Sequence, residues 1–373
     1  MHLDELLRGL AAHKGSDLYL TADSPPLYRV HGATVPATQE TPEPAAIERM
    51  IREVLSAVEQ EEFDRTRELN VARMVPGVGR FRLNVFRQRG QVGLVGRLIP
   101  IEFPDADALG LPASLRDLIM QKRGLVLVTG ATGSGKSTTL AALIHHRNLR
   151  SRGHILTIED PIEFVHPHQG CVVTQREVGV DTASFASALK SALRQAPDVI
   201  LIGEMRELET VEAALHFAET GHLVLGTLHA NNANQAVERV MNFFPAEAHA
   251  QLYAQLALNL RGIVSQRLVP RADGTGRVAA IEVMLNSPRV ADLVAKGEIA
   301  ALKSAIEANA QDGSRSFDQA LHELHRAGVI SLEEALRQAD SANNLRLKIK
   351  MEGARAGTEE RPKFSLEADD QAA

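Results

Sequence analysis

The sequence predicts an α/β protein whose larger part is a doubly wound parallel sheet. Short apolar runs alternate with helix-like segments between residues 114 and 282, as the buried strands of such a sheet do. A glycine-rich sequence at 130–137 joins one of these runs to a helix-like segment. The chain has 373 residues, too many for one ordinary hydrophobic core, so we expect a smaller second domain beside the sheet.

Residues 1–100 are expected to form this smaller α/β domain. The apolar pattern predicts a helix at Leu3–His13, a short strand at Asp17–Leu20 and a second helix at about Pro44–Gln60.

The end of this domain predicts a β-hairpin. Polar and apolar residues alternate over 80–87, as they must in a half-buried strand, and 92–99 is a second apolar run. Residues 88–91 are short enough to form the turn between them. The proline-rich and acidic segment 101–113 then predicts a linker.

Residues 114–290 are expected to hold the parallel sheet. The apolar runs that predict its strands are Leu125–Thr129, Ile155–Ile158, Val199–Ile202 and Leu223–Thr227.

A helical region is expected at 291–351. It includes a helix at Ser331–Ala339, which opens on a serine cap with Glu334 three residues further on. Residues 352–373 contain few apolar side chains, so we expect this tail to be disordered.

The glycine-rich sequence fits the phosphate-binding pattern G-x-x-x-x-G-K-[ST], with an apolar strand before it and a helix-prone run after it. Backbone N–H groups of such a loop wrap the phosphates of a nucleotide, helped by the helix N-terminus. Lys136 would add a positive charge to the phosphates, and the Ser137 hydroxyl would bind Mg²⁺. The sequence therefore predicts ATP with Mg²⁺. The predicted binding residues are Gly130, Ala131, Thr132, Gly133, Ser134, Gly135, Lys136, Ser137 and Thr138.

Acidic residues follow two of the predicted sheet strands. Glu159 and Glu163 come after Ile155–Ile158, and Glu204 comes after Val199–Ile202. The carboxyl ends of parallel strands are where such folds bind ligands, and ATP hydrolysis needs a group that orients or deprotonates water. Glu204 is a candidate to act on Mg²⁺, directly or through water. The alternative is that these acids are solvated loop residues.

Histidines also flank a predicted strand. His222 opens the run 222–230 and His229 lies near its end, but their spacing does not suit a metal site on a helix. His229 follows the strand at the expected ligand edge, so it is a candidate sensor of the nucleotide. For the histidines as a group, a structural role is the alternative.

Arginines are predicted to gather on one face of the N-terminal hairpin. Arg80 and Arg82 are two residues apart on one strand, so both point the same way, and Arg97 lies on the neighbouring strand. These charges repel one another unless an anion is present. They are therefore candidate arginine fingers for a phosphate held by the other domain or by a neighbouring subunit. A solvated face is the alternative.

The composition limits the class of protein. A formal net charge of −6 argues against nonspecific binding of nucleic acid, which needs a basic surface. Cys171 is the one cysteine, so no disulfide can form within the chain and a reducing compartment is expected. The first ten residues include acids and do not look like a signal peptide, and no apolar run reaches the ~18 residues of a membrane span. A cytosolic protein is expected.

Five sequence motifs together resemble a known family. GATGSGKSTT (130–139), ILTIEDPIEFVH (155–166), DVILIGEMR (198–206) and GHLVLGTLHA (221–230) look like the Walker A, Asp box, Walker B and His box of secretion-superfamily ATPases. GRFRLNVFRQRG (79–90) resembles the N-terminal arginine strand of type IV pilus retraction ATPases of the PilT type. The resemblance covers about residues 1–350.

The resemblance implies a PAS-like N-terminal domain, a RecA-like core and a homohexameric ring in the cytoplasm, peripheral to the inner membrane at the base of a type IV pilus. It implies that Glu163 is the catalytic carboxylate with Glu159 beside it, and that Glu204 is the Walker B acid. By the same resemblance, His222 and His229 form the His box, and Arg80, Arg82 and Arg97 face the nucleotide.

The chain departs from parts of the family pattern. Assembly ATPases of the superfamily usually carry a tetracysteine zinc motif, which one cysteine cannot supply, so retraction is favoured over extension. The usual C-terminal helix signature of the PilT type is replaced by 302–321, and with 341–350 this region looks more like the PilU branch. That branch implies a retraction helper, whose partners are a PilT-type motor and a PilC-like platform protein of the inner membrane.

Three functions remain open from the sequence. The first is a motor ATPase that drives or assists pilus retraction. The second is a nucleic-acid translocase, which the net charge and the lack of tryptophan for base stacking disfavour. The third is a catalytically weak subunit that couples another motor to its load, against which the intact Lys136, Glu163 and Glu204 argue.

Overall fold

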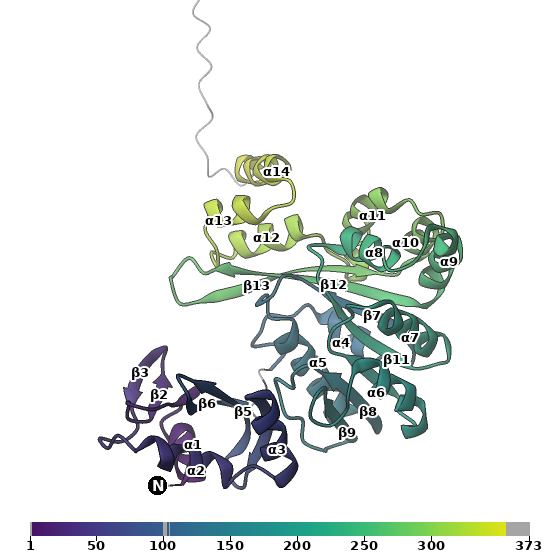
Figure 1. Cartoon of the computed structure of the whole chain (residues 1–373). Helices are drawn as coiled ribbons and strands as arrows, with labels where there is room; N and C mark the ends of the chain where they lie inside the picture. Colours follow the sequence, from purple (N-terminus) through teal and green to yellow (C-terminus); the bar gives the residue numbers. More distant parts are fainter. Residues whose placement is uncertain (1, 100–102, 104, 356–373) are drawn as a thin grey trace, which may run out of the picture.

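The computed structural model describes residues 2–99, 103 and 105–355, and two β-sheets organise them (Figure 1). The strands are β1 (Asp17–Leu20), β2 (Leu27–Val30), β3 (Ala33–Pro36), β4 (Glu68–Val75), β5 (Gly79–Gln88), β6 (Gln91–Ile99), β7 (Gly124–Thr129), β8 (Gly153–Glu159), β9 (Cys171–Glu177), β10 (Val199–Ile202), β11 (Leu223–Leu228), β12 (Leu260–Pro270) and β13 (Arg277–Leu285). The α-helices are α1 (Leu3–Ala12), α2 (Pro44–Arg52), α3 (Ala57–Thr66), α4 (Ala113–Ile119), α5 (Lys136–Arg150), α6 (Phe185–Ala192), α7 (Leu208–Glu219), α8 (Ala233–Met241), α9 (His249–Asn259), α10 (Pro288–Ala295), α11 (Leu302–Ala308), α12 (Phe317–Arg326), α13 (Leu332–Gln338) and α14 (Ala342–Arg355).

The N-terminal sheet has six antiparallel strands in the order β3-β2-β1-β6-β5-β4. Alternation along β5 buries Phe81, Leu83 and Val85 in one core with helices α1, α2 and α3. The polar residues between them lie on the opposite face. The predicted hairpin of β5 and β6 is confirmed, with Arg82 directly opposite Arg97.

The predicted helix at Pro44–Gln60 is wrong in one respect, because the structure divides it into α2 and α3. Ser56 starts the second helix: its hydroxyl accepts a hydrogen bond from the Glu59 N–H, and the Glu59 carboxylate accepts one from the Ser56 N–H. This reciprocal cap satisfies two backbone donors and fixes a new helix start. The strands β2, β3 and β4 were not predicted from the sequence.

The second sheet has seven strands in the order β13-β12-β7-β11-β10-β8-β9. All neighbours are parallel except β12 and β13, which form an antiparallel hairpin, so the predicted parallel sheet is in fact mixed. Residues 271–276 join β12 to β13, and a connection that short allows only antiparallel pairing. Strands β9, β12 and β13 were also missed by the sequence reading.

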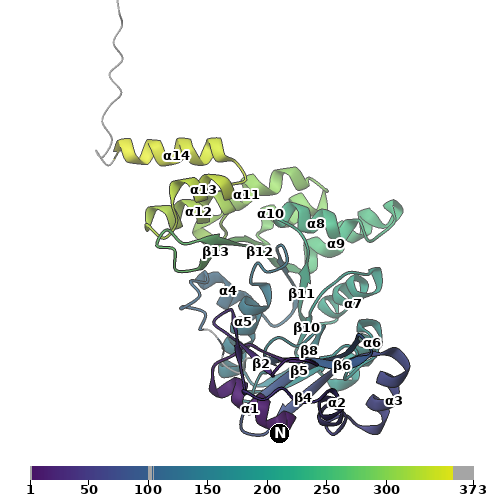
Figure 2. The ribbon, with the colours of Figure 1, turned by 60° about the vertical axis from the view of Figure 1, so that its left-hand side comes forward.

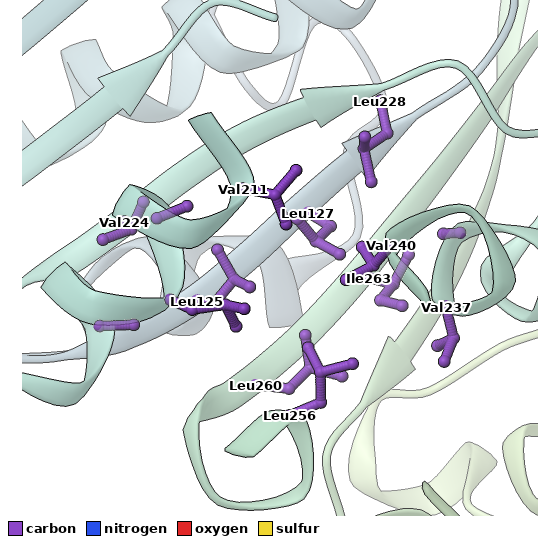
Figure 3. Packing of buried hydrophobic residues seen from close by; sticks show 14 of the residues in the cluster. Leu125, Leu127, Val211, Val224, Leu228, Val237, Val240, Leu256, Leu260 and Ile263 are labelled. Atoms are coloured by element: carbon purple, nitrogen blue, oxygen red, sulfur yellow. The ribbon is translucent and has the colours of Figure 1, made fainter. Parts of the chain in front are cut away.

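Both faces of this sheet are covered, and β7 shows how. Leu125 and Leu127 point into a core with α7, α8 and α9 (Figure 3), whereas Val126 and Val128 point to the other face, where α4 and α5 pack. Two-sided burial explains why the strands are continuous apolar runs in the sequence.

The C-terminal helices α12, α13 and α14 pack beside the β12–β13 hairpin, and Figure 2 shows α14 on their outer side. The predicted cap of α13 is confirmed, since the Ser331 hydroxyl accepts a hydrogen bond from the Glu334 N–H at 3.1 Å. Helix α14 extends to Arg355, four residues into the segment predicted to be disordered, and the rest of that segment lies outside the described residues. Part of the predicted linker also lies outside them.

Candidate functional site: a phosphate loop and a carboxylate loop at one sheet edge

The phosphate loop, residues 130–137, connects β7 to α5 at the carboxyl edge of the parallel strands. Its backbone requires glycine at two points. Gly135 has φ +90°, and a Cβ there would lie 2.8 Å from the Gln266 Nε2; at Gly130 a Cβ would lie 2.6 Å from the Gln266 carbonyl oxygen. The loop is therefore bent tightly against β12, with its N–H groups at the start of a helix, where anions bind.

Lys136 folds back over this loop. Its ammonium group donates hydrogen bonds to the carbonyl oxygens of Gly130 at 2.8 Å and Ala131 at 3.1 Å. Burial lowers the pKa of Lys136, while the carboxylates of Glu204 and Glu163 act in the opposite direction. Two negative side chains are thus close enough to influence the lysine that the sequence assigns to phosphate.

One cleft brings most of the predicted site residues together. It is lined by Thr132, Gly133, Gly135, Lys136, Ser137, Thr138, Glu159, Glu163, Glu204 and His229, with Phe164, His166, Arg206, Thr227, Leu268 and Arg277 among its other walls. The remaining phosphate-loop residues, Gly130, Ala131 and Ser134, line an adjoining hollow together with Gln266 and Arg267.

Glu204 follows β10 and is paired on both sides. Its Oε2 accepts a hydrogen bond from Arg206 Nη2 at 2.6 Å, and its Oε1 lies 2.7 Å from His229 Nε2. Burial alone would raise the pKa of Glu204, but Arg206 and His229 lower it below its usual value. Glu204 is therefore a carboxylate that stays ionised at neutral pH inside the cleft.

Glu159 and Glu163 lie in different environments although only four residues separate them. Glu159 Oε1 accepts hydrogen bonds from the Thr157 hydroxyl at 2.6 Å and the Gln175 amide at 3.1 Å. Burial raises the pKa of Glu159 more than these hydrogen bonds lower it. Glu163 is exposed on the loop beyond, so it is the carboxylate that water can reach.

The two predicted histidines lie at opposite ends of β11. His229 lines the cleft beside Glu204, whereas His222 precedes the strand, at roughly 3.3 Å per residue about 20 Å away. His222 Nδ1 lies 3.2 Å from the Phe217 carbonyl oxygen, and its ring packs edge-on against the Phe217 ring. A catalytic role for His222 within its own chain does not follow from this geometry.

The three predicted arginines share one sheet face, but none of them lines the cleft of its own chain. Arg80 is paired with Glu177 at 2.9 Å, and Arg97 with Asp17 at 2.7 Å. For these two arginines, carboxylates of the same chain supply the anion that relieves their repulsion. Arg82 forms no ion pair with any described residue.

Two histidines that are not among the predicted site residues form an aromatic stack with Phe103 of the linker. The Phe103 ring stacks on His145 with ring centroids 4.8 Å apart and on His166 at 4.6 Å. Burial lowers the pKa of His166 to about 4, so its ring is neutral at physiological pH. This supports a structural role for both histidines.

The sequence alone does not predict that several other residues line the cleft. Arg277 enters the cleft from β13, a strand that was not predicted, and Thr227 donates its hydroxyl to the Gly203 carbonyl oxygen. Arg206 was visible two residues after Glu204, but its role as the partner of that carboxylate depends on how the chain bends there.

The donor chemistry of the cleft fits a magnesium nucleotide. No cluster of three His, Cys, Asp or Glu side chains able to hold a metal occurs within residues 2–99, 103 and 105–355. Mg²⁺ bound with a nucleotide needs few protein ligands, because phosphates and water supply most of its oxygens. The Ser137 hydroxyl and the Glu204 carboxylate, both in the cleft, are hard oxygen donors suited to that arrangement.

A phosphate loop, a buried and largely parallel sheet and the ionised Glu204 at one edge define a P-loop nucleotide-binding protein. A family model described as Type II/IV secretion system protein matches residues 104–337, and the chain belongs to this family. Type IV pilus ATPase PilU of Pseudomonas aeruginosa is 52% identical over 351 residues, which cover 94% of this chain and 92% of that protein.

Two further comparisons agree with the family assignment. The type IV pilus ATPase PilT of Pseudomonas aeruginosa is 42% identical over 344 residues, which cover 92% of this chain and 100% of that protein. The crystal structure of the pilus retraction motor PilT with bound ADP matches with a TM-score of 0.86 at 40% identity, covering 93% of this chain and 99% of that one. The α/β fold is therefore that of the PilT ATPase.

Proposed function

We propose that the protein is an ATPase motor that drives or assists the retraction of type IV pili. The observation that carries the proposal is the cleft itself, where Lys136, Glu163 and Glu204 meet beside one phosphate loop. Relatives across nearly the whole chain are named type IV pilus ATPases.

Each residue of the cleft has a role in this proposal. The phosphate loop and Lys136 hold the phosphates of ATP. Ser137 and, directly or through water, Glu204 would hold Mg²⁺, which would supply neutralisation of the phosphate charge. Glu163, exposed to solvent, orients the attacking water and accepts its proton. His229, in contact with Glu204, responds to the state of the nucleotide.

The motor is proposed to work as a homohexameric ring in the cytoplasm, at the inner-membrane base of the pilus machine. Among the described residues, no helix combines the length and the hydropathy that a membrane span requires. In this proposal a platform protein of the PilC type provides the membrane contact. Arg82, which has no carboxylate partner in the described chain, is the best placed of the three arginines to reach a neighbouring subunit's nucleotide. In this proposal the N-terminal sheet (1–100) is a PAS-like domain, and 114–290 is a RecA-like core.

A second role is favoured by the degree of similarity. The chain is 52% identical to a PilU and 42% identical to a PilT. The proposal therefore places it on the PilU branch, as an ATPase that assists a PilT-type motor. Retraction measured without this protein, and then without the PilT-type motor as well, separates an independent motor from a helper.

The chemistry is tested by ATP turnover and nucleotide binding of the purified full-length protein. We expect Lys136→Ala to abolish productive binding, because the charge that meets the phosphates is removed. Glu163→Gln should bind ATP and hydrolyse it at least ~100-fold more slowly. Wild-type turnover by Glu163→Gln together with an inactive Glu159→Gln would show that the base is assigned to the wrong carboxylate.

A further inference from the structure

The carboxylate loop, residues 160–166, is held by side chains from the neighbouring strand β9. The Gln175 amide nitrogen donates hydrogen bonds to the Phe164 carbonyl oxygen at 2.8 Å and to Glu159 Oε1 at 3.1 Å. Its amide oxygen accepts one from the His166 N–H at 2.7 Å. A single glutamine side chain thus fixes the loop just after Glu163 and joins it to Glu159.

Glu177 holds the same loop just before Glu163. It is 4% exposed, and its Oε2 accepts hydrogen bonds from the Ile162 N–H at 3.3 Å and from Arg80 Nη2 at 2.9 Å. Gln175 and Glu177 are two residues apart on β9, so their side chains lie on one face of the strand. Together they attach the loop at residues 162, 164 and 166, on both sides of the exposed Glu163.

We propose that Gln175 and Glu177 are positioning residues for Glu163, and that Arg80 makes the contribution of Glu177 depend on the N-terminal sheet. The proposal rests on the catalytic role proposed above for Glu163. A carboxylate that orients water must be held to within a fraction of an ångström, because a misplacement of about 1 Å can cost 100-fold in rate. Glu163 makes none of these contacts itself, so the loop backbone carries its position.

The contact between Arg80 and Glu177 can break without disturbing the rest of the loop. Arg80 reaches Glu177 through one nitrogen rather than in a two-pronged pair, and its buried Nε has no partner among the described residues. A displacement of the N-terminal sheet would break this contact and leave Glu177 as a buried charge without its cation. The Gln175 contacts lie entirely within the second sheet and would persist.

The test compares kcat with nucleotide affinity in the full-length protein. We expect Gln175→Ala to lower kcat by about 10- to 100-fold while the Kd for ADP changes less than about twofold, since the phosphate loop is untouched. Gln175→Met keeps the bulk of the side chain and removes its hydrogen bonds, so it should show the same loss of kcat. It replaces Gln175→Ala in the test if the alanine variant does not fold. Val172→Ala, on the same strand with an exposed side chain, is the matched control and should leave both quantities unchanged.

The role of Arg80 is tested by a double-mutant cycle. Arg80→Ala and Glu177→Gln should each lower kcat, and the double variant should be no slower than the slower single variant, because both remove the same ion pair. If the losses in kcat of the two single variants add up in the double variant, the proposed link between Arg80 and Glu177 is wrong. In the Glu163→Gln background neither Gln175→Met nor Glu177→Gln should reduce the residual rate further.

The two proposals fail in different ways. If Glu163→Gln turns over ATP at the wild-type rate, the catalytic assignment is wrong and the positioning role falls with it. If Glu163→Gln is slow but Gln175→Ala and Gln175→Met keep the wild-type kcat, the positioning role alone is wrong. A parallel loss of ADP affinity and melting temperature would make β9 a purely structural strand.

Discussion

The phosphate loop and the carboxylate loop lie at the same edge of one sheet, but they are held in different ways. The phosphate loop depends mainly on its own backbone, bent at Gly130 and Gly135 and followed directly by α5. The carboxylate loop depends on side chains from elsewhere, Gln175 and Glu177 on β9 and, through Glu177, Arg80 of the N-terminal sheet. The shape of the phosphate loop is therefore fixed within the second sheet, whereas the proposed positioning of Glu163 also involves the N-terminal sheet.

The largest effect is expected where the local loop is damaged. Gly135→Ala places a methyl group 2.8 Å from Gln266 Nε2 at a φ of +90°, so the loop must move and nucleotide binding should fall below detection. Binding of ADP, measured by calorimetry, checks this. Gly274→Ala has a comparable φ of +73° but open space around it, in the β12–β13 turn, and should bind ADP normally. Normal ADP binding by Gly135→Ala would show that the loop does not need the backbone conformation of a glycine at this position.

A smaller effect is expected at Arg82, which tests whether the N-terminal sheet also serves a neighbouring chain. Arg82→Ala should lower kcat at least ~10-fold, with ADP affinity nearly unchanged, if its guanidinium contacts a phosphate across an interface. Mixing it with Lys136→Ala should restore some turnover, because some interfaces then combine an intact arginine with an intact phosphate loop. Arg89→Ala, exposed in the turn after β5, is the control.

No recovery on mixing, or a specific activity that does not depend on protein concentration in a demonstrated monomer, would contradict the role of Arg82 between chains. The dependence of Glu163 on Arg80 within one chain would be unaffected by that result.

The smallest effect is expected at Glu282. Like Gln175 and Glu177, this side chain contacts the backbone of a segment next to a cleft residue. Its Oε1 accepts hydrogen bonds from the Ala233 N–H at 2.7 Å, four residues after His229, and from the Ser265 hydroxyl at 3.2 Å. Burial raises the pKa of Glu282 to about 7, with Asp340 acting in the same direction and Arg267 against it.

The sign of the resulting pH dependence is fixed by this shift. Between about pH 4.5 and 7 the folded protein holds a proton that the unfolded chain has released, so the free energy of unfolding falls as pH rises through that window. Glu282→Gln removes this dependence and should melt about 2 °C or more above the wild type at pH 8, with a smaller difference at pH 5. Melting curves at both pH values check this, and a pH-independent difference would rule it out.

The sequence could predict the phosphate loop because the residues of its motif are contiguous in the chain. The positions of Glu163, Glu204 and His229 at one cleft followed from the rule that parallel strands end at one edge. Gln175 and Glu177 could not be found in this way, since no motif marks them and β9 was not predicted. Their roles depend on the register of β8 with β9, which places Glu177 beside Glu159.

The division of the predicted helix at Pro44–Gln60 into two helices is marked in the sequence. Ser56 and Glu59 form the S-x-x-E pattern of a capping box, which would have divided the predicted helix correctly. The carboxylates that neutralise Arg80 and Arg97 had no such signal, because the three-strand register and the contact between the two sheets bring Glu177 and Asp17 to them.

The shape of the phosphate loop also depends on Gln266, a residue that lies far from the motif in the sequence. This residue of β12 packs behind Gly130 and Gly135, and its side-chain oxygen accepts a hydrogen bond from the Thr139 hydroxyl at 2.8 Å. A fragment that ended after β11 would keep every residue of the Walker motifs and lose the surface against which the loop is shaped. The smallest piece of this protein that can hold a nucleotide must therefore continue beyond residue 266, into the hairpin on which the C-terminal helices pack.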